Sequence, residues 1–96
     1  MTEIDAIRLS PDDNVATVLR AVSSGETLRV RCGEAVTAVV AQQPVPLCHK
    51  ISLQAIPKGD AVIKYGQNIG ASMAAIPAGH HVHVHNMQSA RAKATA

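Results

Sequence analysis

Apolar and polar residues alternate over short stretches along most of the chain, a pattern typical of β-strands. Residues 3–9 begin with an imperfect alternation, and residues 27–31 and 35–41 follow as two clearer stretches, joined through Cys32-Gly33-Glu34. A three-residue connection that contains glycine suits a hairpin, so these two stretches are predicted to pair. Residues 35–41 are apolar on both faces, which predicts a central strand.

Residues 10–24 are the stretch whose pattern predicts a helix instead. Ser10 is a favourable N-cap residue, Pro11 suits the first helical position, and two acidic residues follow in the first turn. Apolar residues then recur at helical spacing up to Val22, and Gly25 can adopt the left-handed conformation that ends helices. The prediction is one short amphipathic helix packed on a sheet.

A weak internal repeat organises the second half of the chain. Its three copies begin at Val45, Ile56 and Ile76 and share the order apolar residue, proline, any residue, Gly or Cys, polar residue, any residue, apolar residue. Proline presets φ for a turn, the small residue permits a left-handed backbone, and the apolar residue resumes a strand. Residues 64–70 contain two glycines and an asparagine and predict a bend or bulge.

The third copy leads into residues 79–86, which hold four of the five histidines. Side chains alternate along an extended strand, so three histidines are predicted on one face and two valines in the core. Imidazole can bind a metal or an anion, or transfer a proton near neutral pH. The alternative is an ordinary solvated strand face, although such a face more often carries Lys, Glu, Thr or Ser. The residues concerned are His81, His83 and His85 on the polar face and Val82 and Val84 on the apolar face.

Composition limits the size and class of the protein. The chain has 96 residues, of which 1% are aromatic. This length and composition predict a single domain over residues 1–88, with a modest core of small aliphatic side chains. Residues 89–96 are small and polar and are predicted to form a flexible tail. The formal charge of +2 includes no basic run, and Tyr65 is the single aromatic platform, so nucleic-acid binding receives little support.

The cysteines and the start of the chain bear on its location. Cys32 and Cys48 lack a CxxC spacing and are predicted to be packing thiols rather than nucleophiles. The first residues do not resemble a signal peptide, and the apolar runs are too short to span a membrane. A soluble cytoplasmic protein that contacts no membrane is therefore expected.

Basic side chains adjoin the proline turns, in the pairs His49-Lys50 and Lys64-Tyr65. If the turns gather at one end of the sheet, these lysines and the histidine strand face a common carboxylate or phosphate. The alternative is that each lysine is a solvated residue that protects a sheet edge. Asn14 is a further candidate, because its amide would lie at the predicted helix N-terminus, where it could orient a hydroxylated ligand.

A metal is the second possibility for the histidine stretch. Three same-face histidines on a straight strand span roughly 13–14 Å, so at most a neighbouring pair can reach one ion. The predicted pair is His83 and His85. Further ligands would have to come from His49, Asp13 or another chain, which leaves this domain as an incomplete metal site.

Taken together, these motifs resemble the N-terminal SAF domain of the altronate and galactarate dehydratases. The resemblance covers about residues 5–88 and rests on residues 10–16, 48–51, 63–70 and 79–86, which occur in the family order. It implies a β-clip fold like that of type III antifreeze proteins and of the C-terminal domain of sialic acid synthases. The family usually has glycine where Cys48 stands, so this turn has to accept a side chain.

The resemblance also implies a function. The chain is expected to be the small subunit of a carbon–oxygen lyase that acts on a sugar acid such as altronate or galactarate, or of a carbon–sulfur lyase that acts on sulfolactate. It would be inactive without a large dehydratase-like subunit, which would hold most of a divalent metal site for iron, magnesium or manganese. The expected residues are His83 and His85 for catalysis and metal contact, and Asn14, His49, Lys50, Lys64, Tyr65 and Asn86 for substrate binding. The alternatives are a non-catalytic module that binds a sugar acid or docks a partner, and a structural β-clip that forms a homo-oligomer.

Overall fold

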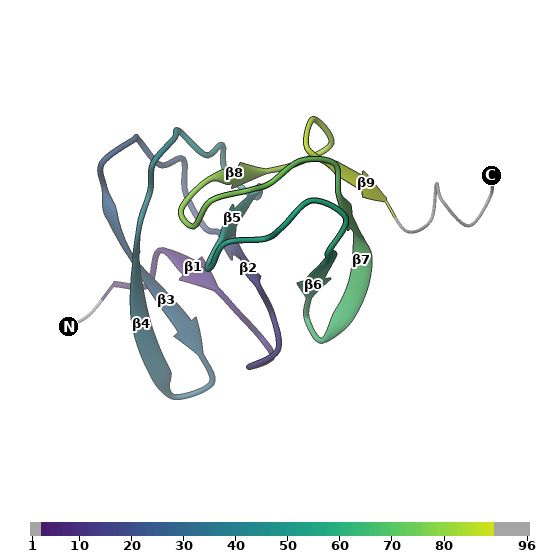
Figure 1. The fold of residues 1–96 in the computed structure, drawn as a ribbon. Coiled ribbons are helices and arrows are strands. Elements are labelled where there is room, and N and C mark those ends of the chain that lie inside the picture. The colour runs from purple at the N-terminus through teal and green to yellow at the C-terminus, as the bar shows by residue number, and fades with distance from the viewer. Residues whose placement is uncertain (1–2, 90–96) are drawn as a thin grey trace.

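The computed structural model describes residues 3–89, which form nine short β-strands in two sheets (Figure 1). The larger sheet has six strands in the order β4-β3-β1-β2-β5-β8, and the smaller has three in the order β6-β7-β9. Neighbouring strands are antiparallel, except that β1 and β3 are parallel. The prediction of a mainly β protein is confirmed. The strands are β1 Ala6–Ile7, β2 Val15–Val18, β3 Thr27–Cys32, β4 Ala35–Val40, β5 Lys50–Ser52, β6 Ala61–Lys64, β7 Gln67–Ser72, β8 His81–Val82 and β9 Met87–Ser89.

The helix predicted over residues 10–24 is wrong, since no helix forms within residues 3–89. Its capping signals instead close an isolated turn, in which the Asp13 N–H donates to the Ser10 carbonyl at 3.0 Å. The following residues form β2, which pairs with β1 and β5. Val15 enters one hydrophobic core and the adjacent Ala16 the other, because successive side chains of an extended strand point to opposite faces.

The predicted repeat is confirmed, and the structure adds a fourth copy that begins at Val22. This copy is not predicted from the sequence, because Ser23 stands where the others have proline. In every copy the fourth residue has a positive φ, and its N–H donates to a carbonyl of a neighbouring segment. The φ angles are 92° at Gly25, 69° at Cys48, 89° at Gly59 and 80° at Gly79.

The four copies combine as two pairs, and each pair contributes to its own core. Val22 bridges to Val45 in one pair, and Ile56 bridges to Ile76 in the other. The first pair packs with residues of β2, β3 and β5, whereas the second packs with Val15, Val62 and Val82. β2 contributes to both cores and so joins the two halves of the domain.

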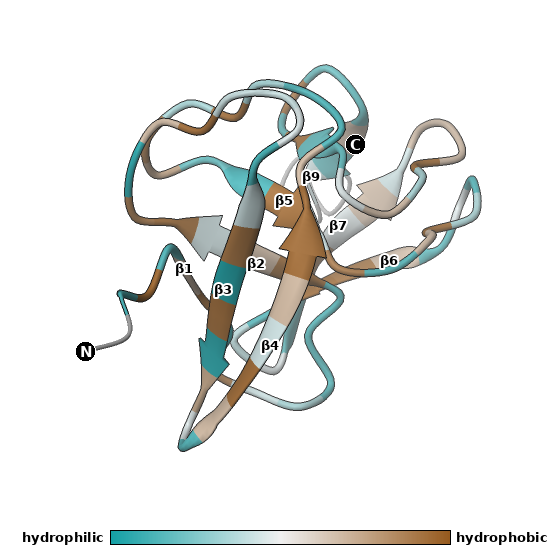
Figure 2. Cartoon of the chain, turned by 90° about the vertical axis from the view of Figure 1, so that its left-hand side faces the viewer, coloured by the Kyte–Doolittle hydropathy of each residue, from teal (hydrophilic) through white to brown (hydrophobic). Residues whose placement is uncertain are grey.

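The hairpin of β3 and β4 is confirmed, but the prediction that its second strand is central is wrong. β4 lies at the edge of the larger sheet and pairs with β3 alone among the strands described. Its apolar side chains are largely exposed, including Val36 and Val40. Figure 2 shows the hydrophobic colour along much of β4. A run that is apolar on both faces therefore forms an exposed apolar edge strand here, rather than a buried central one.

The predicted bend in residues 64–70 is confirmed. Tyr65 and Gly66 both have positive φ, at 56° and 76°, and form the tight turn between β6 and β7. The register also shifts between Val62 and Ile63, as in a β-bulge. Of the predicted tail, Ser89 ends β9, and residues 90–96 lie outside the described residues. No helix long and apolar enough to cross a membrane was found in the described part of the chain.

Candidate functional site

The histidine-rich stretch is not one straight strand, contrary to the prediction. β8 contains only His81 and Val82, and residues 83–86 then form a turn that leads into β9. Val82 is buried as predicted, but Val84, which was predicted to face the core, is 73% exposed. The strand pattern ends here because Asn86 supplies a turn.

Asn86 holds this turn with both atoms of its side-chain amide. Its Oδ1 accepts from the His83 N–H at 3.0 Å, and its Nδ2 donates to the His81 carbonyl at 2.9 Å. The amide of Asn86 is bonded to the backbone and so positions the two histidines. Its expected contact with substrate stays a prediction.

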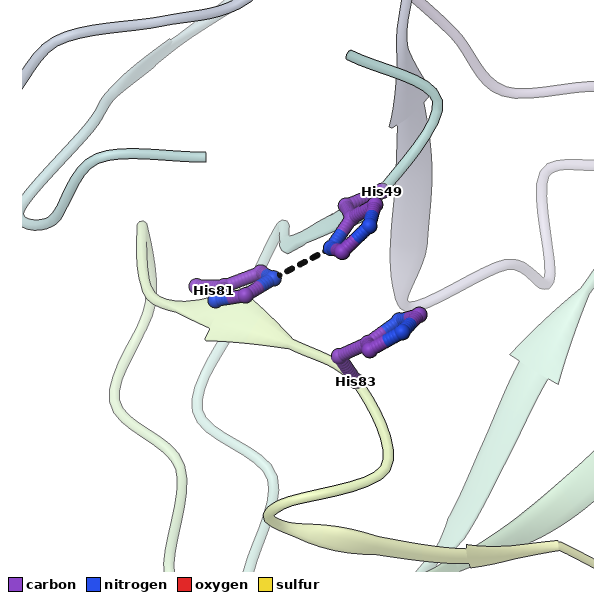
Figure 3. Close-up of side chains that lie close together, drawn as sticks. All are labelled: His49, His81 and His83. Atoms are coloured by element: carbon purple, nitrogen blue, oxygen red, sulfur yellow. Dashed lines mark hydrogen bonds between the residues drawn. The ribbon is translucent and has the colours of Figure 1, made fainter. Parts of the chain in front are cut away.

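The turn leaves His81 and His83 beside His49, which lies before β5 (Figure 3). Lys50 pairs with Val82, so continuing this register by one residue places His49 opposite His83. The rings of His49 and His83 stack with their centroids 3.8 Å apart. His49 Nδ1 also lies 2.8 Å from His81 Nε2, within hydrogen-bond distance.

His49, His81 and His83 form a three-histidine cluster, and the catalytic and metal contacts expected of His83 and His85 stay predictions. Each ring offers a nitrogen, and the three nitrogens lie within 4.8 Å of one another. His85 is exposed in the turn, where its ring centroid lies 4.9 Å from that of His81. A single straight strand could not predict this cluster, because His49 follows a different proline turn from His81 and His83.

The surroundings of the cluster are basic. Burial, followed by the charges of His85, His49, His83 and Lys50, lowers the pKa of His81 to about 4. Burial and the neighbouring His49 and Lys50 also lower the pKa of His83. Burial and Lys64 lower the pKa of Lys50. These imidazoles therefore favour the neutral form, and the combined field favours a bound anion.

Thr17 on β2 connects the two lysine-bearing turns. It pairs with Lys50 across the β2–β5 ladder, and its Oγ1 accepts a hydrogen bond from the Tyr65 hydroxyl at 3.2 Å. Lys64 Nζ in turn lies 4.9 Å from the centroid of the Tyr65 ring. The gathering of the turns is predicted from the sequence, whereas Thr17 is not, since an isolated threonine carries no motif.

Asn14 does not lie at a helix N-terminus, because that helix is absent. Its Oδ1 accepts from the Ile63 N–H at 2.8 Å, and its Nδ2 donates to the Ala61 carbonyl at 2.9 Å. The amide therefore joins the segment before β2 to β6. This gives Asn14 a positioning role, and its contact with substrate stays a prediction.

Cys48 occupies a strained position beside the cluster, and it is exposed rather than buried as predicted for a packing thiol. A residue with a Cβ costs roughly 1–2 kcal/mol in the left-handed region. We expect Cys48→Gly to stabilise the fold by about 0.5–1 kcal/mol, after allowing for the flexibility of glycine when unfolded. Urea denaturation measures this change, with Cys48→Ala as the control that removes the thiol and keeps the strain. Equal stability of the two variants would show that the φ angle costs little.

Comparison with known proteins shows similarity to two groups of lyases. Residues 4–90 match the family model described as the altronate/galactarate dehydratase SAF domain. The chain is 34% identical over 83 residues to the altronate dehydratase of Bacillus subtilis, and 41% identical over 83 residues to that of Escherichia coli. Each match covers 86% of this chain but only 16% of the relative, so the chain spans about a sixth of those dehydratases.

A smaller relative has nearly the same extent as this chain. The (2R)-sulfolactate sulfo-lyase subunit alpha of Chromohalobacter salexigens is 31% identical over 91 residues. That match covers 92% of this chain and 97% of the relative. Sequences of this kind therefore occur both as a part of long dehydratases and as a short polypeptide that is named as a subunit.

Proposed function

Because the chain belongs to the altronate/galactarate dehydratase SAF domain family, we propose that it is the small subunit of a lyase and lends an anion-binding surface to a shared active site. The observation that carries this proposal is that Lys50 lies near both Lys64 and the histidine cluster. Thr17 pairs with Lys50 and accepts a hydrogen bond from the Tyr65 hydroxyl, and so connects the two turns. The substrate would be a sugar acid that loses water or sulfolactate that loses sulfite. The other part of the site would belong to a separate large subunit.

The charges of the site suit such substrates. A sugar acid carries a carboxylate and sulfolactate also carries a sulfonate, and the ammonium groups of Lys50 and Lys64 are strong point charges for either anion. In the proposed elimination, a base removes the proton from the carbon next to the carboxylate. The released electron pair forms a carbon–carbon double bond as the carbon–oxygen or carbon–sulfur bond breaks.

Neutral histidine supplies the proton chemistry in this proposal. His83 favours the neutral form because of burial and its basic neighbours, so its free lone pair can accept a proton or bind a metal, but not both at once. His85 lies exposed at the same turn and is the base in this proposal when His83 holds a metal. Protonation of the departing hydroxide gives water, whereas sulfite leaves as the anion. A divalent metal, when bound at the site, would stabilise negative charge on the substrate carboxylate.

Exposed apolar side chains beside the cluster support a covering partner. Leu47 precedes His49 by two residues and is 55% exposed. Val84 lies between His83 and His85 in the sequence and is 73% exposed. Large apolar residues that flank a basic site are typical of a protein contact surface. A partner seated on them would exclude water from the site and strengthen its electrostatic interactions.

The test is reconstitution with a large dehydratase-like protein, sought among the proteins encoded beside this chain. We expect turnover of altronate, galactarate or (2R)-sulfolactate only when both proteins are present. Lys50→Met should raise the KM of the complex about 10- to 100-fold, because a hydrogen bond to a charged group contributes roughly 1.5–3 kcal/mol. The matched control is Lys58→Met, which changes an exposed lysine on another proline turn.

Two outcomes would contradict the proposal. Full turnover by the large protein alone would remove the need for this chain. Equal kinetics of the Lys50→Met and Lys58→Met complexes would remove the assigned anion contact. Binding of a sugar acid by the chain alone, together with unchanged turnover of every variant complex, would instead favour the non-catalytic binding module.

A further inference from the structure

We propose that His49, His81 and His83 together bind one divalent transition-metal ion, and that this chain does so without a partner. Each histidine offers one nitrogen, and the three nitrogens lie within 4.8 Å of one another. The rings come from two segments that the pairing of β5 with β8 holds side by side (Figure 3). The proposal does not rest on the proposed lyase function, because it concerns the isolated chain.

The nitrogen separations are close to those of a metal site. Nitrogens bound to one tetrahedral ion at 2.0–2.1 Å lie about 3.4 Å apart. His49 Nδ1 and His81 Nε2 are already 2.8 Å apart, and the widest separation in the cluster is at most 4.8 Å. The widest pair would have to close by about 1.4 Å, which rotation of the side chains can supply.

A buried atom without a partner points to the same conclusion. Nδ1 of His83 is buried and has no hydrogen-bond partner among the described residues. Leaving a buried polar atom unpaired costs about 1–3 kcal/mol, so such an atom in a native fold calls for an explanation. An ion coordinated by Nδ1 of His83 would give this atom its missing partner.

The backbone beneath the cluster is preorganised. The side-chain amide of Asn86 accepts a hydrogen bond from the His83 N–H and donates one to the His81 carbonyl. These two bonds fix the backbone positions of His81 and His83 relative to each other. The third ring belongs to His49, whose N–H closes its turn on the Pro46 carbonyl at 3.0 Å. Supporting groups of this kind orient metal ligands in many proteins and strengthen metal binding.

The donor set selects the kind of metal. Imidazole nitrogen suits Fe²⁺, Co²⁺, Ni²⁺, Cu²⁺ and Zn²⁺, whereas Mg²⁺ prefers oxygen ligands. Of the metals that the family resemblance implies, iron therefore fits this cluster and magnesium does not. Three protein ligands also leave at least one position open, as in catalytic rather than structural sites. A carboxylate held by Lys50 could occupy that position.

The test is metal titration of the complete, metal-free chain. We expect one equivalent of Co²⁺ to bind, with a visible absorption band that reports the coordination of the ion, and Zn²⁺ to compete for the same site and raise the thermal midpoint. Mg²⁺ should do neither. His49→Ala and His83→Ala should each weaken binding by more than the roughly 10- to 100-fold that loss of a supporting group costs. His80→Ala removes a neighbouring histidine outside the cluster and should bind Co²⁺ as the unchanged chain does.

Equal weakening by His80→Ala and His49→Ala would overturn the assignment, as would a Co²⁺ affinity no greater than that for Mg²⁺. Circular dichroism of each variant separates loss of the site from loss of the fold, and His49→Gln keeps a polar side chain if the alanine variant unfolds. A chain that binds Co²⁺ in an inactive complex would contradict only the proposed function. An active complex made with a chain that binds no transition metal would contradict only this inference.

Discussion

Gly79→Ala is expected to destabilise the protein by about 3 kcal/mol or more, whereas Gly59→Ala should cost only about 1–2 kcal/mol. The two glycines have similar backbone angles, with φ of +80° and +89°. A Cβ at Gly79 would lie 2.2 Å from the Val40 carbonyl oxygen, but a Cβ at Gly59 would meet nothing within 4 Å. Both substitutions therefore carry the strain of a left-handed residue, and only the first also forces two backbone segments apart.

The clash at Gly79 would disturb hydrogen bonds on both sides of the chain. The Gly79 N–H donates to the Ser52 carbonyl at 2.8 Å, and the Gly79 carbonyl accepts from the Gln42 N–H at 2.8 Å. These bonds fix the entry into β8 and so the position of His81. Urea denaturation at neutral pH measures both variants, and Gly59→Ala is the matched control. Equal losses would show that the backbone relieves the contact easily and that the entry into β8 tolerates movement.

The proline turns could be predicted from sequence because their conformation is encoded locally. A proline followed two residues later by a small residue restricts φ in the turn whatever packs above it. The copy at Val22 shows the limit of this reasoning, since its backbone adopts the same turn without proline. The helix prediction failed for a related reason. The capping signals at Ser10 are local, but pairing of β2 with β1 and β5 decided the structure of the residues that follow.

The candidate site was only partly predictable for the same physical reason. Its residue types were visible, because four histidines in six residues stand out in any sequence. Their grouping was not, because His49 and His81 are 32 residues apart and meet through the register of β5 and β8. Asn86 is a residue type that favours turns, so the sequence did indicate a turn at this position. The prediction of one continuous strand overlooked it.

Asp13→Asn is expected to destabilise the protein by roughly 2–3 kcal/mol at neutral pH, with a loss that shrinks in acid. Asp13 is 2% exposed, and its carboxylate accepts from the Gly66 N–H at 2.7 Å and from the Ser10 N–H at 3.2 Å. Burial alone would raise its pKa, but backbone N–H donors, led by that of Gly66, lower it below the usual value of 3.8. An asparagine of the same shape loses the charge and turns its amide N–H₂ group toward one of these donors.

The direction of the pH effect follows from the lowered pKa. A carboxyl group with a lower pKa in the folded protein stabilises the fold fully above its unfolded pKa of about 3.9, and this contribution is lost as the pH falls through the folded value. The gap in unfolding free energy between the unchanged chain and Asp13→Asn should therefore be constant near pH 6–7 and narrow below about pH 4. Asp12→Asn, at an exposed position one residue earlier, is the control and should show little loss.

A gap that stays constant down to pH 3 would mean that the Asp13 charge does not hold the turn. A narrowing gap would connect acid stability to the site itself, because the Gly66 donor belongs to the same tight turn as Lys64 and Tyr65. Loosening this turn should release the Tyr65 hydroxyl from Thr17. Thr17 pairs with Lys50 of β5, so this hydrogen bond connects the turn that carries Lys64 to the strand that carries Lys50. Asp13→Asn should then weaken anion binding by the assembled protein even at a pH where the fold survives, although Asp13 itself contacts no ligand in this proposal.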